Sequence, residues 1–225
     1  LRHRRNVGIP ELSRNGIPEE DRELGAAIAV RIASMGLHED ASTRKYVSLV
    51  GNAVVEETPL YDETFVFIVL DSPEVRSFAT PGGYVFVTTG ALGLMHDEAE
   101  LAGVLGHEIV HVVNRHGIEE LEKQQAHIRS ESLISDLDRE LEKLDMDQGD
   151  ERVIEDLEEL ADEMFERIIS GRQKETEEES DRLGTLLIYN TGYKANGLME
   201  FILSTEELEA GKKDPSYSHH PAAER

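Results

Sequence analysis

Apolar positions in the first part of the chain follow helical spacing. The segment from Pro18 to Gly36 opens with a proline and acidic residues and ends on glycine, which predicts a helix. Its apolar residues share one face: Ile28, Ile32 and Met35. A second helix is expected after Asp40, whose carboxylate can cap it.

Two short segments then change to a strand pattern. "TFVFIVLDS", Thr64 to Ser72, is rich in β-branched and aromatic residues and is bounded by polar ones. In "PGGYVFVTTG", a turn leads into a second strand from Tyr84 to Thr88. The pattern downstream is helical throughout. We therefore expect an α+β fold that is mostly helical and has a small sheet.

The next helix begins at Asp97, which precedes Glu100 by three residues as in a capping box. Its apolar surface is broad: Leu101, Val104, Leu105, Val112 and Val113. Gly117 is expected to end this helix in the left-handed conformation.

Residues 117–176 form a separate compositional block, with 20 acidic and 8 basic residues. Apolar residues recur at every third or fourth position, and "DQGD", Asp147 to Asp150, marks a turn between two such runs. We expect a helical hairpin with solvated acidic faces. The alternatives are a docking surface for a basic protein partner and a lid over a cleft. Further helices are expected from about Glu175 to Gly192 and from about Ala195 to Ala210.

Size and charge narrow the classes of function. The 225 residues suit one domain, 1–225, with an extended arm at 1–17 and the acidic hairpin at 117–176 as an insertion. A net charge of -24 disfavours nucleic acid and anionic lipid as partners. The chain has no cysteine, and its longest apolar run, "FVFIVL", is too short to cross a bilayer. We expect it to be a fragment of a longer protein.

The stretch "VLGHEIVHVVNRHG", Val104 to Gly117, carries the candidate chemistry. His107 and His111 are four residues apart, so one helical face presents both imidazoles to one metal ion. Glu108 is turned by about 100° from His107, beside the metal rather than on it. This H-E-x-x-H spacing is typical of zinc peptidases, in which the glutamate takes a proton from the attacking water.

A catalytic zinc site needs a third protein ligand. A histidine in H-E-x-x-H-x-x-G-x-x-H is excluded, because Asn114 and Gly117 occupy the glycine and histidine positions. His116 falls one residue short, and we interpret it as a polar residue at the helix end. Among the downstream acids of "KETEEESDRLG", Lys174 to Gly184, both Glu177 and Glu178 can share a face with Asp181, and the residues alone leave this choice open.

Several motifs together extend beyond this spacing: "PEEDRELG", "PGGYVFVTTGAL", "DEAELAGVLGHEIVHVVNRHG", "EEESDRLG" and "HPAAER". With them the chain from Pro18 to Arg225 resembles the HtpX, Oma1 and CAAX prenyl endopeptidase family of gluzincin metallopeptidases. The resemblance is strongest to its soluble bacterial branch of BepA-like periplasmic proteases. It implies a zincin-like domain with a small sheet beside the active-site helix, and a periplasmic location.

The resemblance also implies roles for single residues. His107, His111 and Glu177 would bind one zinc ion, Glu108 would be the general base, and Asp181 would contact a ligand imidazole. His220 would stabilise the oxyanion or, as a fourth ligand, hold the enzyme latent; Arg225 is a weaker oxyanion candidate.

The sheet edge that pairs with substrate would be the strand from Tyr84 to Thr88, approached from Phe78. Three positions depart from the family pattern. Arg76-Ser77 replaces Asn-Ala, with an expected effect on substrate docking, and Ser180 replaces alanine.

We therefore expect a zinc-dependent metalloendopeptidase that cleaves polypeptide substrates. One alternative is a latent peptidase scaffold that acts mainly as a chaperone or assembly factor, with His220 closing the zinc site. Another is an acidic helical protein in which the H-E-x-x-H spacing is accidental.

Overall fold

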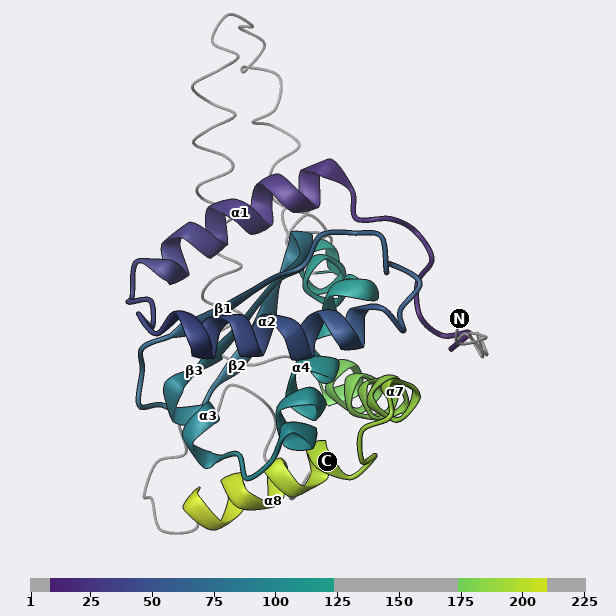
Figure 1. The fold of residues 1–225 in the computed structure, drawn as a ribbon. Helices are drawn as coiled ribbons and strands as arrows, with labels where there is room; N and C mark the ends of the chain where they lie inside the picture. Colours follow the sequence, from purple (N-terminus) through teal and green to yellow (C-terminus); the bar gives the residue numbers. More distant parts are fainter. Residues whose placement is uncertain (1–8, 124–173, 210–225) are drawn as a thin grey trace, which may run out of the picture.

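The computed structural model describes residues 9–123 and 174–209. In this part of the chain it confirms an α+β fold that is mostly helical and has one small sheet (Figure 1). Its elements in chain order are α1 (Glu19–Ala33), α2 (Ala41–Val55), β1 (Val66–Leu70), β2 (Ser77–Thr80), the 3-10 turn η1 (Pro81–Gly83), β3 (Tyr84–Thr88), α3 (Thr89–Leu94), α4 (Glu98–Val113), α7 (Lys174–Thr191) and α8 (Gly197–Glu209).

The sheet has the order β1-β3-β2, with β3 parallel to β1 and antiparallel to β2. The expectation that Tyr84–Thr88 forms the sheet edge is therefore wrong for the described sheet, because this strand lies between β1 and β2. Phe78, from which it was expected to be approached, lies in β2. The four residues of β2 are too few to stand out in the sequence pattern. The chain reverses after β2 because Gly82 and Gly83 adopt positive φ angles of 79° and 95°.

The two faces of the sheet belong to two hydrophobic clusters, as the alternation of side chains along a strand requires. Val85 and Val87 of β3 pack into the larger cluster with α2 and α4. Phe86, between them, belongs to the smaller cluster with α1 and stacks on Phe78 of β2 at a ring-centroid distance of 5.1 Å. Ser77 and Ala79 alternate with Phe78, so their side chains lie on the face toward α4.

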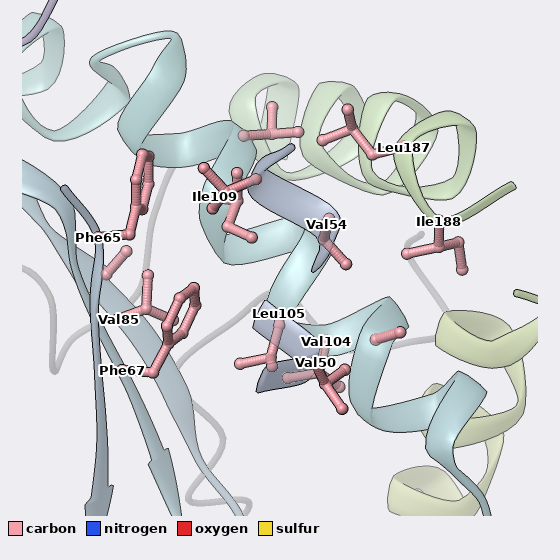
Figure 2. Close-up of a cluster of buried hydrophobic side chains, with 14 of the residues drawn as sticks. Val50, Val54, Phe65, Phe67, Val85, Val104, Leu105, Ile109, Leu187 and Ile188 are labelled. Carbon is pink, nitrogen blue, oxygen red and sulfur yellow. The ribbon is translucent and has the colours of Figure 1, made fainter. Parts of the chain in front are cut away.

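Helix α4 runs through the middle of the larger cluster. Every residue from Ala99 to Val113 is buried, as expected for a helix that is apolar on nearly all sides. In Figure 2, Leu105 and Ile109 lie between sheet residues such as Phe67 and the α7 residue Leu187. The H-E-x-x-H residues are therefore inside the protein, between the sheet and α7.

The two ends of α4 are held differently. At the start, the Asp97 carboxylate accepts hydrogen bonds from the backbone N–H groups of Ala99 and Glu100. At the other end, the prediction that Gly117 terminates the helix is wrong. Asn114 is the C-cap and Arg115 takes a left-handed φ of 56°.

The Arg115 backbone is strained by about 1–2 kcal/mol, and its side chain offsets this strain. The guanidinium donates two hydrogen bonds to the buried carboxylate of Asp21 in α1, at 2.7 and 2.8 Å. Helical structure then resumes over residues 116–123.

The four helices predicted around residues 18–36, after Asp40, and near 175–192 and 195–210 are present as α1, α2, α7 and α8. The expected hairpin lies outside the described residues over 124–173, as does the arm over 1–8. Residues 9–17 contain no helix or strand, and bury Ile9 and Leu12 in the larger cluster. Over 9–123 and 174–209, no helix combines the length and the apolar character that crossing a membrane demands.

Candidate metal centre

Helices α4 and α7 approach each other closely because both have glycine where they cross. A Cβ on Gly184 of α7 would lie 2.8 Å from the backbone nitrogen of His107, and one on Gly106 of α4 would lie 3.2 Å from the carbonyl oxygen of Gly184. This contact brings the first turns of α7 against the histidine face of α4.

His107, His111 and Glu177 meet beside this crossing, and as a group they could hold a metal ion. The two Nε2 atoms are 3.0 Å apart. Glu177 Oε2 lies 3.5 Å from His107 Nε2, and Glu177 Oε1 lies 3.3 Å from His111 Nε2. Donors bound tetrahedrally at about 2.0–2.1 Å would be about 3.3 Å apart, so these spacings fit a small four-coordinate ion.

The outer nitrogen of His107 contacts the second predicted carboxylate. His107 Nδ1 is 2.8 Å from Asp181 Oδ1, one helical turn after Glu177 on α7. With a proton on Nδ1, the imidazole donates to Asp181 and turns an unprotonated Nε2 toward Glu177. Glu178 is half exposed and pairs with Lys174 at 3.6 Å, so the geometry brings Glu177 and not Glu178 to the histidines.

His116 is a residue whose position the sequence reasoning missed. It is 2% exposed, and its Nδ1 lies 2.9 Å from Nδ1 of His111. On a continuous helix it would point about 140° away from His111. The break at Asn114 and Arg115 brings it back, so no periodic pattern could have indicated the contact.

Glu108 is fully buried and contacts the edge strand. Ser77 Oγ of β2 donates a hydrogen bond of 2.9 Å to Glu108 Oε1. Ser77 departs from the family pattern, and the expected consequence concerned substrate docking. The structure places its hydroxyl on the carboxylate of the H-E-x-x-H motif.

The surroundings anchor the end of α4. The hydrogen bond to Asp21 raises the pKa of the Arg115 guanidinium above its ordinary value. A cavity of about 20 Å³ borders His111, Arg115 and Thr80 of β2.

The predicted site residues His220 and Arg225 lie outside the described residues.

The comparisons with known proteins identify a peptidase family. The sequence model of the family described as "Peptidase family M48" matches residues 41–225. A Vibrio cholerae protein assigned as a beta-barrel assembly-enhancing protease is 28% identical over 187 residues, which are 82% of this chain and 38% of that protein.

Two shorter similarities are also to proteins named as proteases. The beta-barrel assembly-enhancing protease of Yersinia pestis is 33% identical over 93 residues, 41% of this chain and 19% of that protein. The mitochondrial metalloendopeptidase OMA1 of Bos taurus is 44% identical over 55 residues, 24% of this chain and 10% of that protein. The chain thus spans well under half the length of these relatives. The match over 41–225 covers most of the chain, which belongs to peptidase family M48.

Proposed function

We propose that this protein is a zinc-dependent metalloendopeptidase that hydrolyses peptide bonds of protein substrates. The observation that carries the proposal is the convergence of two imidazole nitrogens and one carboxylate within 3.0–3.5 Å of one another, inside the protein. Membership of a peptidase family and similarity to named metalloendopeptidases support the same reaction class.

In this proposal His107, His111 and Glu177 hold the zinc ion. Two imidazoles and a carboxylate are a donor set that zinc accepts and that leaves a fourth position open. When bound, zinc would polarise the substrate carbonyl and lower the pKa of a water molecule toward about 7. Asp181 fixes the His107 ring so that its Nε2 stays directed at the site.

Glu108 is the proposed general base. Ser77 donates a hydrogen bond to Oε1 and so orients the carboxylate, which takes a proton from the attacking water. The water oxygen forms a bond to the carbonyl carbon, the C–N bond breaks, and Glu108 returns the proton to the leaving amine. Burial of Glu108 keeps this proton transfer away from bulk solvent.

The proposed substrate site includes strand β2. Strand β2 lies beside β3 in the described sheet, and its Ser77 contacts Glu108. A substrate bound next to β2 would therefore lie beside the catalytic carboxylate. A periplasmic location, expected from the family resemblance, belongs to the same proposal.

The test measures metal content and proteolysis on the same preparations. The wild-type chain should retain about one zinc per chain after dialysis and should cleave casein. Glu108→Gln should retain the zinc and lose cleavage by at least about 100-fold, because the amide cannot take the proton. A wild-type chain without stoichiometric zinc, or an E108Q variant that cleaves casein normally, would contradict the proposal.

A second candidate is the latent scaffold that acts as a chaperone or assembly factor. Two observations favour it. The three residues that would bind zinc are at most 3% exposed, and the bordering cavity of about 20 Å³ has room for about one water molecule. In this reading His220 closes the fourth position on zinc. His220→Ala should then raise proteolysis several-fold; equal rates in variant and wild type would remove the support for latency.

A further inference from the structure

The two candidate ligand imidazoles each have a partner at Nδ1, but the two partners differ. Asp181 contacts His107 Nδ1 at 2.8 Å, whereas the partner of His111 Nδ1 is another imidazole, His116, at 2.9 Å. We propose that His116, backed by Glu179, is a positioning residue that orients His111 toward the metal through a hydrogen-bond relay. This inference rests on the proposed function, since it concerns how the zinc site is held.

The direction of each hydrogen bond follows from the inner end of the relay. His111 Nε2 faces His107 Nε2 and Glu177, so a metal ligand at this position must carry no proton there. A neutral His111 then has its proton on Nδ1 and donates it to His116 Nδ1. His116 therefore accepts at Nδ1 and has its own proton on Nε2.

The outer end of the relay agrees with this assignment. His116 Nε2 lies 3.4 Å from Glu179 Oε2, and a carboxylate at neutral pH can only accept. The other oxygen of Glu179 accepts from Asn114 Nδ2 at 3.2 Å, which fixes the carboxylate beside the helix break. Ser180 Oγ also lies 3.4 Å from His116 Nδ1.

His116 cannot itself be a further ligand in this geometry. It contacts Nδ1 of His111, whereas the atoms that would bind the metal lie on the Nε2 side of the same ring. The planes of the His111 and His116 rings are 81° apart and their centroids are 4.9 Å apart. The two Nδ1 atoms, 2.9 Å apart, therefore lie between the ring centres, as a nitrogen-to-nitrogen hydrogen bond requires. The first two turns of α7 thus orient both imidazoles, through Asp181 directly and through Glu179 by way of His116.

Two substitutions distinguish a hydrogen-bonding role of His116 from a role in packing alone. His116→Asn keeps an acceptor oxygen near the Nδ1 position but loses volume. His116→Phe keeps the volume of the ring but has no acceptor. The zinc dissociation constant, measured by chelator competition on the full chain, should rise 10–100-fold for H116F and less than about threefold for H116N.

The opposite order, with H116F binding zinc like wild type and H116N binding it weakly, would show that His116 only fills space and would overturn the relay. Asp181→Asn is the positive control, and its zinc dissociation constant should rise by about as much as that of H116F. Glu178→Gln, at a half-exposed position, is the matched control and should bind zinc like wild type. A wild-type chain that binds no zinc contradicts the proposed function itself, which keeps the two failures apart.

A measurement on the unaltered protein avoids any loss of folding in the variants. Long-range ¹⁵N–¹H NMR spectra of the zinc-loaded chain distinguish the two neutral tautomers of each histidine. His107 and His111 should have the proton on Nδ1, and His116 should have it on Nε2. A His116 with its proton on Nδ1 would overturn the relay, because that nitrogen could not then accept from His111.

Discussion

Gly184 of α7 lies so close to His107 of α4 that a Cβ at position 184 would be 2.8 Å from the His107 backbone nitrogen. Asp181 and Glu177 precede this contact by about one and two turns on the same helix. The position of Gly184 therefore sets how near α7 brings its carboxylates to His107 and His111. Packing of two backbones, rather than attraction between charges, determines the geometry of the candidate site.

Gly184→Ala should push α7 away from α4, because backbone atoms rather than a flexible side chain oppose the new methyl group. We expect a loss of about 1–3 kcal/mol in the free energy of unfolding and weaker zinc binding. Urea denaturation and chelator competition measure the two effects. Gly93→Ala is the matched control. Apart from its chain neighbours and the backbone of its own helix, no described atom lies within 4 Å of its Cβ position, and alanine favours the helix, so stability should be equal or higher. Equal stability of the G184A variant and wild type would contradict the prediction.

Metal removal should destabilise the wild-type chain, because an ion bound only by the folded state shifts the unfolding equilibrium. At free zinc about 100 times the dissociation constant, the expected stabilisation is about 2.7 kcal/mol, or about 5–10 °C in Tm. Thermal unfolding with and without a chelator measures this difference.

Two neighbouring glutamates provide the variant and its control for that experiment. Glu177→Gln should abolish the zinc-dependent part of Tm, because it removes a charged donor that faces both histidines. Glu178→Gln should preserve it, because Glu178 pairs with Lys174 on the exposed side of α7. The reverse outcome would assign the third ligand to Glu178 and contradict the geometry described above.

The hydrogen bond from Ser77 to Glu108 should be measurable by a double-mutant cycle. Ser77→Ala should cost about 1–3 kcal/mol of stability, since it removes a donor from a buried carboxylate. The same substitution in a Glu108→Leu background should cost less, with a coupling of about 0.5–3 kcal/mol. Urea unfolding of the four metal-free proteins gives the coupling, and a value of zero would mean that the contact adds no stability.

Glu98, at the start of α4, should make stability depend on pH. It accepts hydrogen bonds of 2.6 Å from the hydroxyl groups of Tyr193 and Tyr46, which lower the pKa of its carboxyl group. A carboxyl group whose pKa is lowered by folding stabilises the protein above its unfolded pKa, about 4.3, and loses that contribution as the pH falls through the folded value.

Glu98→Gln should therefore be less stable than wild type at pH 7, and the difference should close below about pH 4 as Glu98 becomes protonated. Urea midpoints at several pH values measure this closure. The exposed Glu207→Gln serves as the control and should stay within about 0.5 kcal/mol of wild type. A difference between wild type and E98Q that is constant with pH would exclude the charged hydrogen bonds as its cause.

The local features of the chain were predictable because short-range geometry decides them. The four-residue spacing of His107 and His111 places both on one face of any helix, and the turn residues and caps indicate where α1, α2, α7 and α8 occur. The family resemblance extended this to Glu177 and Asp181. The order of the strands was not predictable in this way, since nothing within β3 distinguishes a central strand from an edge.

By itself, then, the sequence determined the helices, the spacing of the two imidazoles and the acidic residues that could join them. The tertiary structure decided which residues actually meet: Glu177 rather than Glu178, Ser77 on Glu108, and His116 on His111. The physical reason is that these contacts depend on the glycine crossing of α4 and α7, on the register of β2 and on the left-handed turn at Arg115. Each of these features either joins segments far apart in the chain or interrupts a regular helix. The periodic pattern of the sequence therefore cannot predict them.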